Sequence, residues 1–317
     1  NISRPLYSSW AKLTGGLSLS KNRSINIFNY PDTVYRNYQY NIVDVWGGFN
    51  FRNQFKGTGY NSNKPNLAVE LRRFSKNFTM QPDQDSFKSN PLYNSHRYLL
   101  SKFVLFHQEF FKTNYFFGFG RTEDIPLGYN YSASFGYDNW VGRGRAYTAL
   151  EGQKFWFLGK NLISANAAFG SFWYNHHSED AVLHIQADYY SNLFRLKNPK
   201  LREFLHADYI VCFNPVLYKQ VNINRENGIL GYRYTLFNNY QRMNLSAQTN
   251  YYSPLNVYGF KFNFYVQVQA SLLTKQTESI FKSPFYSGFT IGCQIRNENL
   301  SFNTFQLSAS YQPLVDH

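Results

Sequence analysis

The sequence predicts an all-β fold, a transmembrane antiparallel β-barrel of about 16 strands, and three observations support this prediction. Long segments near the C-terminus alternate apolar and polar residues with a period of two. Aromatic residues make up 20% of the chain, with 27 Tyr and 31 Phe, yet the mean hydropathy is -0.47. The sequence contains no stretch of about 18 apolar residues, the length that a membrane-spanning helix needs. Without such helices, a chain in lipid satisfies its backbone only as a closed sheet.

The clearest alternation runs from Val257 to Leu272. From Phe260 onward one face is entirely apolar, and the other carries Lys, Asn, Tyr, Gln and Ser. Strands of soluble proteins are mostly about 5 to 6 residues long, whereas a tilted strand crossing a bilayer needs about 9 to 11. Strands of a soluble sandwich, which also bury one face, are the alternative. The pattern recurs at 244–251, 285–296 and 304–311.

The length of the chain sets the expected number of strands. A strand and its connection take roughly 20 residues, and bacterial barrels prefer even strand numbers, so 317 residues fit about 16 strands in one domain, 1–317. Turn-forming residues separate the runs at 61–65, 82–85, 123–128, 197–200 and 224–228. The predicted strands lie at 7–19, 35–52, 66–80, 96–108, 111–119, 129–138, 144–157, 161–174, 181–195, 203–214, 232–238, 240–252, 257–273, 285–296 and 302–312.

The N-terminus lacks the charged and apolar regions of a secretory signal. Export to a bacterial outer membrane needs such a signal. We therefore expect a mature or trimmed product, which leaves room for soluble periplasmic domains upstream of Asn1.

The formal charge of +13 invites a nucleic-acid interpretation. The basic residues are scattered over strand ends and loops, however, and no helix-turn-helix, zinc-finger or RNA-binding motif accompanies them. In a barrel, these cations would interact with outer-membrane lipid head groups and lipopolysaccharide phosphates at the two rims, which explains the positive charge without a nucleic acid. We expect no nucleic-acid partner.

Residues with metal-binding or catalytic chemistry are few. The densest cluster is His176, His177, Glu179 and Asp180, which the pattern places in a solvated extracellular loop; with no second group at ligand spacing, we expect no metal and no cofactor. A second set occupies alternate positions of two consecutive predicted strands, so we expect its members to line a barrel lumen rather than to catalyse a reaction: His184, Asp188, His206 and Asp208. A barrel hydrolase that uses a Ser with His206 and Asp208 is the alternative.

The most specific local feature precedes the C-terminal alternating segments and comprises Gly228, Ile229, Leu230, Gly231, Tyr232 and Arg233. Here the sequence resembles the bacterial surface antigen superfamily, the sixteen-stranded outer-membrane barrels of BamA, TamA and FhaC type. In that family a loop with a Val/Ile-Arg-Gly-Phe/Tyr motif folds back into the lumen and precedes four more strands. The 85 residues after Tyr232 suffice for about four or five strands. The resemblance is sharp only from about residue 224 to the end.

The chain departs from this family at two charged positions. The resemblance implies that the motif Arg pairs with an Asp on a later strand, in a Phe-x-Asp-x-Gly pattern. Leu230 stands at the Arg position, and residues 268–271 stand against the second pattern, with Gln269 and Ser271 as the expected loop contacts. Losing one partner of a buried pair costs roughly 3–5 kcal/mol, whereas losing both together is almost neutral. An ordinary turn at Gly228 and Gly231 is the alternative.

The resemblance implies a function without enzymatic activity. Family members insert outer-membrane proteins or secrete polypeptides, and their partners are unfolded client polypeptides and other envelope proteins. The opening seam would involve residues 6–18 and 302–311. Because both motif charges are absent, a divergent scaffold within an envelope complex fits equally well, and a passive porin or small-solute channel is the rival class.

Overall fold

The computed structural model describes residues 1–4, 12–31, 35–51, 65–88, 90–116, 118, 122–196, 198–217, 221, 228–229, 239–274, 278–297 and 304–313. Nearly all regular structure within them is β-strand, with one short α-helix, α1 (Asp85–Lys88), and two 3-10 turns at Pro91–Tyr93 and Ile280–Lys282. The strands are β1 (Ile2–Arg4), β2 (Leu13–Ser24), β3 (Tyr38–Phe51), β4 (Asn66–Met80), β5 (His96–Asn114), β6 (Thr122–Trp140), β7 (Arg143–Leu158), β8 (Asn161–Tyr174), β9 (His177–Tyr190), β10 (Phe194–Arg195), β11 (Lys200–Phe213), β12 (Gln241–Val257), β13 (Phe260–Thr274), β14 (Phe285–Asn297) and β15 (Phe305–Tyr311).

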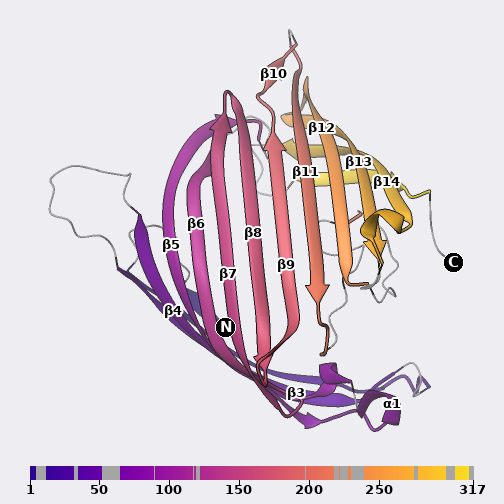
Figure 1. Ribbon diagram of the computed structural model, residues 1–317. Helices are drawn as coiled ribbons and strands as arrows, with labels where there is room; N and C mark the ends of the chain where they lie inside the picture. The colour runs from indigo at the N-terminus through magenta and orange to yellow at the C-terminus, as the bar shows by residue number, and fades with distance from the viewer. Residues whose placement is uncertain are drawn as a thin grey trace.

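All fifteen strands belong to one antiparallel sheet. Each strand pairs with its neighbours in the chain, except that β10 pairs only with β11, and β9 therefore lies directly beside β11. Figure 1 shows that this sheet is strongly curved, with β3 and β4 on one flank and β12 to β14 on the other. The predicted all-β, antiparallel fold is confirmed.

The sheet is open, so the predicted closed barrel is not observed. Among the described residues no pairing joins β15 to β1 or β2. Strand β1 pairs with β2 only from Gly15 to Leu17, so among the described residues the edge of β2 from Ser18 onward is unpaired on that side. Residues 5–11, 298–303 and 314–317, which adjoin both edges, lie outside the described part of the chain.

The two faces of the sheet differ in polarity, and the apolar face is the exposed one. Val266 and Val268 in β13 are 54% and 43% exposed, whereas Gln269 next to them is 7% exposed. Leu150 is 65% exposed and lies opposite Phe169 of β8. The protected face has apolar clusters, such as the one of Ala68, Val104 and Phe106, but it also carries many polar and charged side chains, among them Asp138, Arg145, Asp208, Arg242, Asn244, Ser271 and Thr290. This polarity is the reverse of that of a water-soluble sheet, which buries its apolar face.

Two predicted boundaries were wrong. The runs 96–108 and 111–119 form the single strand β5 up to Asn114, and the predicted turn at 123–128 lies inside β6. Pro126 suggested a turn because proline cannot donate a backbone hydrogen bond. The register explains why it is tolerated: β6 pairs with β7 only from Gly128 onward, so Pro126 has a strand on one side only. The predicted strand at 232–238 lies outside the described residues.

No helix among the described residues is long and apolar enough to cross a membrane.

Candidate functional site

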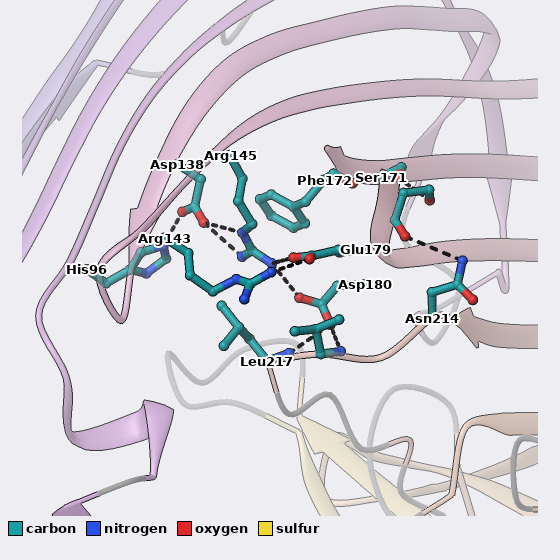
Figure 2. A network of polar contacts seen from close by, with 12 residues as sticks. His96, Asp138, Arg143, Arg145, Ser171, Phe172, Glu179, Asp180, Asn214 and Leu217 are labelled. Atoms are coloured by element: carbon teal, nitrogen blue, oxygen red, sulfur yellow. Dashed lines mark hydrogen bonds and ion pairs between the residues drawn. The ribbon is translucent and has the colours of Figure 1, made fainter. Parts of the chain in front are cut away.

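A network of buried charges crosses the polar face of β6 to β9, near the end of the sheet formed by residues 141–142, 175–176 and 214–217, called here the network end. Arg145 lies at its centre and is 1% exposed. Its Nη2 is 2.8 Å from Oδ2 of Asp138, which stands opposite it in the β6–β7 register. Its Nη1 is 2.7 Å from Oδ2 of Asp180 in β9, and its guanidinium lies 4.2 Å from the ring centroid of Phe172. Figure 2 shows Arg145 between the two carboxylates.

Further side chains contact the carboxylates of the network. His96 contacts Asp138, and Arg143 contacts Glu179, whose second oxygen is 3.6 Å from Arg145. Two arginines thus face three carboxylates, and one of these carboxylates also contacts His96. Buried charges are stable in a protein only when they are paired in this way. We therefore interpret the network as a positioning device rather than as a reactive centre.

The object that the network positions is the segment between β11 and β12, of which residues 214–217, 221, 228–229 and 239–240 are described. The Asp180 Oδ1 accepts hydrogen bonds from the backbone N–H groups of Val216, at 2.8 Å, and Leu217, at 3.1 Å. The backbone N–H of Asp180 donates to the carbonyl of Asn214 at 2.8 Å. One carboxylate therefore fastens the start of this β11–β12 segment to the buried arginine (Figure 2).

A second attachment involves the motif that carries the family resemblance. Gln269 donates from Nε2 to the carbonyl of Gly228 at 2.9 Å. Ile229 is 2% exposed and packs with the buried residues Val221, Leu273 and Tyr286.

The close approach of Ile229 to β14 requires a glycine in that strand. A Cβ at Gly288 would lie 2.6 Å from Cγ2 of Ile229. Ser271 points to the same face and is 1% exposed, but its hydroxyl has no hydrogen-bond partner within the described residues. Leu230, Gly231, Tyr232 and Arg233 lie outside the described residues, so their predicted place in the lumen stays a prediction.

The structure brings together the four residues predicted to line the interior. His206 Nδ1 is 2.5 Å from Oδ1 of Asp188, directly across the β9–β11 pair. His184 Nε2 is 3.3 Å from Oδ2 of Asp208, which also accepts a hydrogen bond from Arg242 at 3.1 Å. The sequence analysis did not predict Arg242. This residue lies two positions before Asn244 and therefore on the same face of β12, so the alternation of that strand, extended by two residues, would have identified it.

The geometry around Asp188 differs from that of a catalytic triad. Ser164 Oγ donates to Asp188 at 2.7 Å, and His206 contacts the same carboxylate. In a triad the nucleophile contacts the histidine, and the carboxylate holds the other side of the ring. Here both groups are held by Asp188, so these contacts do not activate Ser164 as a nucleophile.

The predicted solvated loop at residues 176–180 was wrong for two residues. Glu179 and Asp180 are 7% and 1% exposed and belong to the buried network, because a β-bulge beside Phe172 turns them toward the polar face. His176 does lie in the turn between β8 and β9, and His177 begins β9. Within the described part of the chain, no group of three or more His, Cys, Asp or Glu side chains could hold a metal ion.

Comparisons of the chain with family models, with curated proteins and with solved structures give no match. The fold and the site define a class by themselves: a curved antiparallel sheet with an exposed apolar face and a polar face to which the segment after β11 is attached.

Proposed function

We propose that this chain forms the wall of an outer-membrane β-barrel that handles polypeptides, in protein insertion or secretion, as the bacterial surface antigen superfamily does. The observation that carries the membrane part is the reversed polarity of the sheet. A monomeric soluble protein rarely exposes apolar patches larger than a few hundred Å². Lipid removes this cost, since acyl chains solvate the apolar face while the polar face turns inward.

The spacing of aromatic residues on the apolar face fits a bilayer. Trp173 and Tyr137 stand on either side of Ala146 in the cross-strand register, and Trp156 lies ten positions further along β7. At about 3.3 Å per residue and a tilt of about 40°, ten residues rise about 25 Å, the height of the apolar band of such barrels. Leu150 and Phe169 lie between these aromatic levels. Lys154 faces the same side near Trp156, at a depth from which its amine can reach the head groups.

Two adjacent substitutions in the middle of β13 test membrane insertion. Val266 faces outward, and Gln267 faces inward, where it donates to Ser246 Oγ at 3.1 Å. Val266→Arg should destabilise the protein folded in phosphatidylcholine vesicles by about 2–4 kcal/mol, since it places a charge at the bilayer centre. Gln267→Arg should cost about 1 kcal/mol or less. Urea titrations of folding in vesicles measure both, and the opposite order would indicate a water-soluble sheet.

The polypeptide part of the proposal is supported by two features. The β11–β12 segment is attached to the polar face through its described residues, and the edges of β2 and β15 carry unpaired backbone groups among the described residues. Unpaired edges template another strand. In hydrocarbon they must be satisfied, either by closure of the barrel or by a client strand.

Site-specific photo-crosslinking tests the role of the edge. A photoreactive residue at Leu307, in the edge strand β15, should form adducts with an unfolded outer-membrane polypeptide supplied in vitro. The same residue at Phe289 in β14, which has strands on both sides, is the matched control. Equal adducts at both positions, or none at either, would favour a scaffold over an insertion or secretion role.

Conductance separates this proposal from a passive porin, whose polar interior would be equally compatible with the sheet. Purified protein in planar bilayers should be nearly silent because the described residues of the β11–β12 segment are attached to the polar face. Steady, large openings would instead identify a small-solute channel.

A further inference from the structure

A strongly basic cavity lies at the end of the sheet opposite the network end. It has a volume of about 870 Å³ and is bounded by the end of β5, the β7–β8 turn and the chain from β9 into β11. Five cations line it, and the lining contains no carboxylate among the described residues: Lys112, Lys160, Arg195, Lys200 and Arg202.

These cations have less compensation than Arg145, which contacts two carboxylates directly. Within the part of the chain that the structure describes, none of the five forms an ion pair. Asp124 stands opposite Lys112 in the β5–β6 register without an ion pair between them. The Glu123 carboxylate accepts the backbone N–H of Phe116 at 2.7 Å, and it lies close enough to Arg202 to favour its charged form, although no ion pair forms between them among the described residues.

Arg202 is the most deeply buried of the five cations. It is 5% exposed, and its Nε has no hydrogen-bond partner among the described residues. Its guanidinium lies 4.7 Å from the ring centroid of Phe116, and Lys200 Nζ lies 3.8 Å from that of Tyr115. Aromatic faces stabilise cations only modestly. A buried guanidinium with an unmatched donor, on the wall of a cavity that four further cations line, calls for an anion.

We propose that this cavity binds a ligand bearing two phosphate groups, a pyrophosphate or a bisphosphorylated head group. Arginine offers a planar, bidentate donor pair that matches phosphate oxygens, and lysine supplies compact point charges. Five cations around one cavity exceed what a single phosphate of charge about −2 would neutralise. The same chemistry could be supplied by a membrane lipid or by a soluble phosphate compound.

Inorganic pyrophosphate is the first probe, measured by isothermal titration calorimetry with the full chain in zwitterionic detergent. We expect saturable binding of one pyrophosphate per chain. The double variant Lys112→Gln/Lys160→Gln changes two exposed side chains of the cavity, so folding should be unaffected. Its Kd should rise at least about tenfold, because each charge-assisted hydrogen bond lost weakens binding by about that factor.

The matched control is Lys21→Gln/Lys282→Gln, which removes the same charge from two exposed lysines outside the cavity. Its Kd should stay within about twofold of the unmodified chain, since exposed charges far from the ligand are screened. Absence of saturable binding, or equal weakening in the two variants, would overturn the proposal, because only non-specific attraction to a basic protein would remain.

A second arm assigns the source of the phosphate. The protein is placed in phosphatidylcholine nanodiscs with or without lipid A, a bisphosphorylated glycolipid. If lipid A blocks pyrophosphate binding, the site takes a membrane head group; if pyrophosphate binds equally in both, the site takes a soluble phosphate. Both results support phosphate recognition and differ only in its source.

Discussion

The two flanks of the sheet have the same apolar outer face but differ in their inner face. The first flank consists of β2 to β4. In it every residue of β2 is exposed or half-buried, and β4 has a single buried residue, Ala68. In the second flank, β11 to β14 each bury several residues, most of them polar. The second flank adjoins the described attachments of the β11–β12 segment. Outward exposure is therefore a property of each strand, whereas inward burial depends on what packs against the strand.

Two arginine–carboxylate pairs on the inner face, one in the first flank and one in the middle of the sheet, make the effect of inward burial measurable. Arg72 of β4 donates to Asp44 of β3 through two hydrogen bonds, at 2.9 and 2.5 Å, but its side chain is 47% exposed. Arg145 makes contacts of similar length and is 1% exposed. Arg72 and Arg145 therefore make the same kind of contact with carboxylates, but only Arg145 is buried.

The largest expected effect is that of Arg145→Met. It should lower the free energy of unfolding by about 3–5 kcal/mol, because Asp138 and Asp180 would remain buried without their counter-charge. Arg72→Met is the matched control and should cost about 1 kcal/mol or less, since water solvates Asp44 when the arginine is removed. Urea unfolding in detergent measures both. Equal costs would show that the burial of an ion pair does not set the cost of breaking it.

A smaller effect on stability is expected where Ile229 packs against Gly288 of β14. Gly288→Ala places a methyl group 2.6 Å from Ile229 Cγ2, so the segment must shift at a cost of about 1–3 kcal/mol. At Gly47 in β3 the nearest atom to a new Cβ is 3.9 Å away, so Gly47→Ala should change stability by about 1 kcal/mol or less. Planar-bilayer recordings provide a second readout: only Gly288→Ala should increase conductance. If both variants remain silent and equally stable, Ile229 does not hold the segment in place.

The smallest effect on stability is expected from loss of the single hydrogen bond between Gln269 and the Gly228 carbonyl. Gln269→Leu removes the donor to the Gly228 carbonyl and should cost about 1–2 kcal/mol. Gln267→Leu, two residues earlier on the same face, removes a contact within the sheet instead. Hydrogen exchange at the Ile229 amide should accelerate only in the first variant. Faster exchange in both would attribute its protection to the sheet as a whole.

The interior shows where the sequence was informative and where it was not. Alternation placed His184, Asp188, His206 and Asp208 on one face, and the register of β9 with β11 brings them into contact. The same reasoning failed for Glu179 and Asp180, because a β-bulge interrupts the period of two, and only the three-dimensional course of β8 and β9 turns both toward Arg145. Arg145 pairs with Asp138 across a hairpin, but it also pairs with Asp180, 35 positions away, a separation that local patterns do not encode.

The sequence by itself determined the all-β class, the antiparallel order of neighbouring strands and the side of each strand that is apolar. These follow from side chains that alternate across a strand and from short connections between neighbours, which are local properties. The tertiary structure alone decided that the sheet stays open among the described residues, that a carboxylate of β9 fastens the segment after β11, and that five cations meet at one cavity. Each of these depends on residues that are distant in the chain and meet only because a twisted, curved sheet brings their strands together.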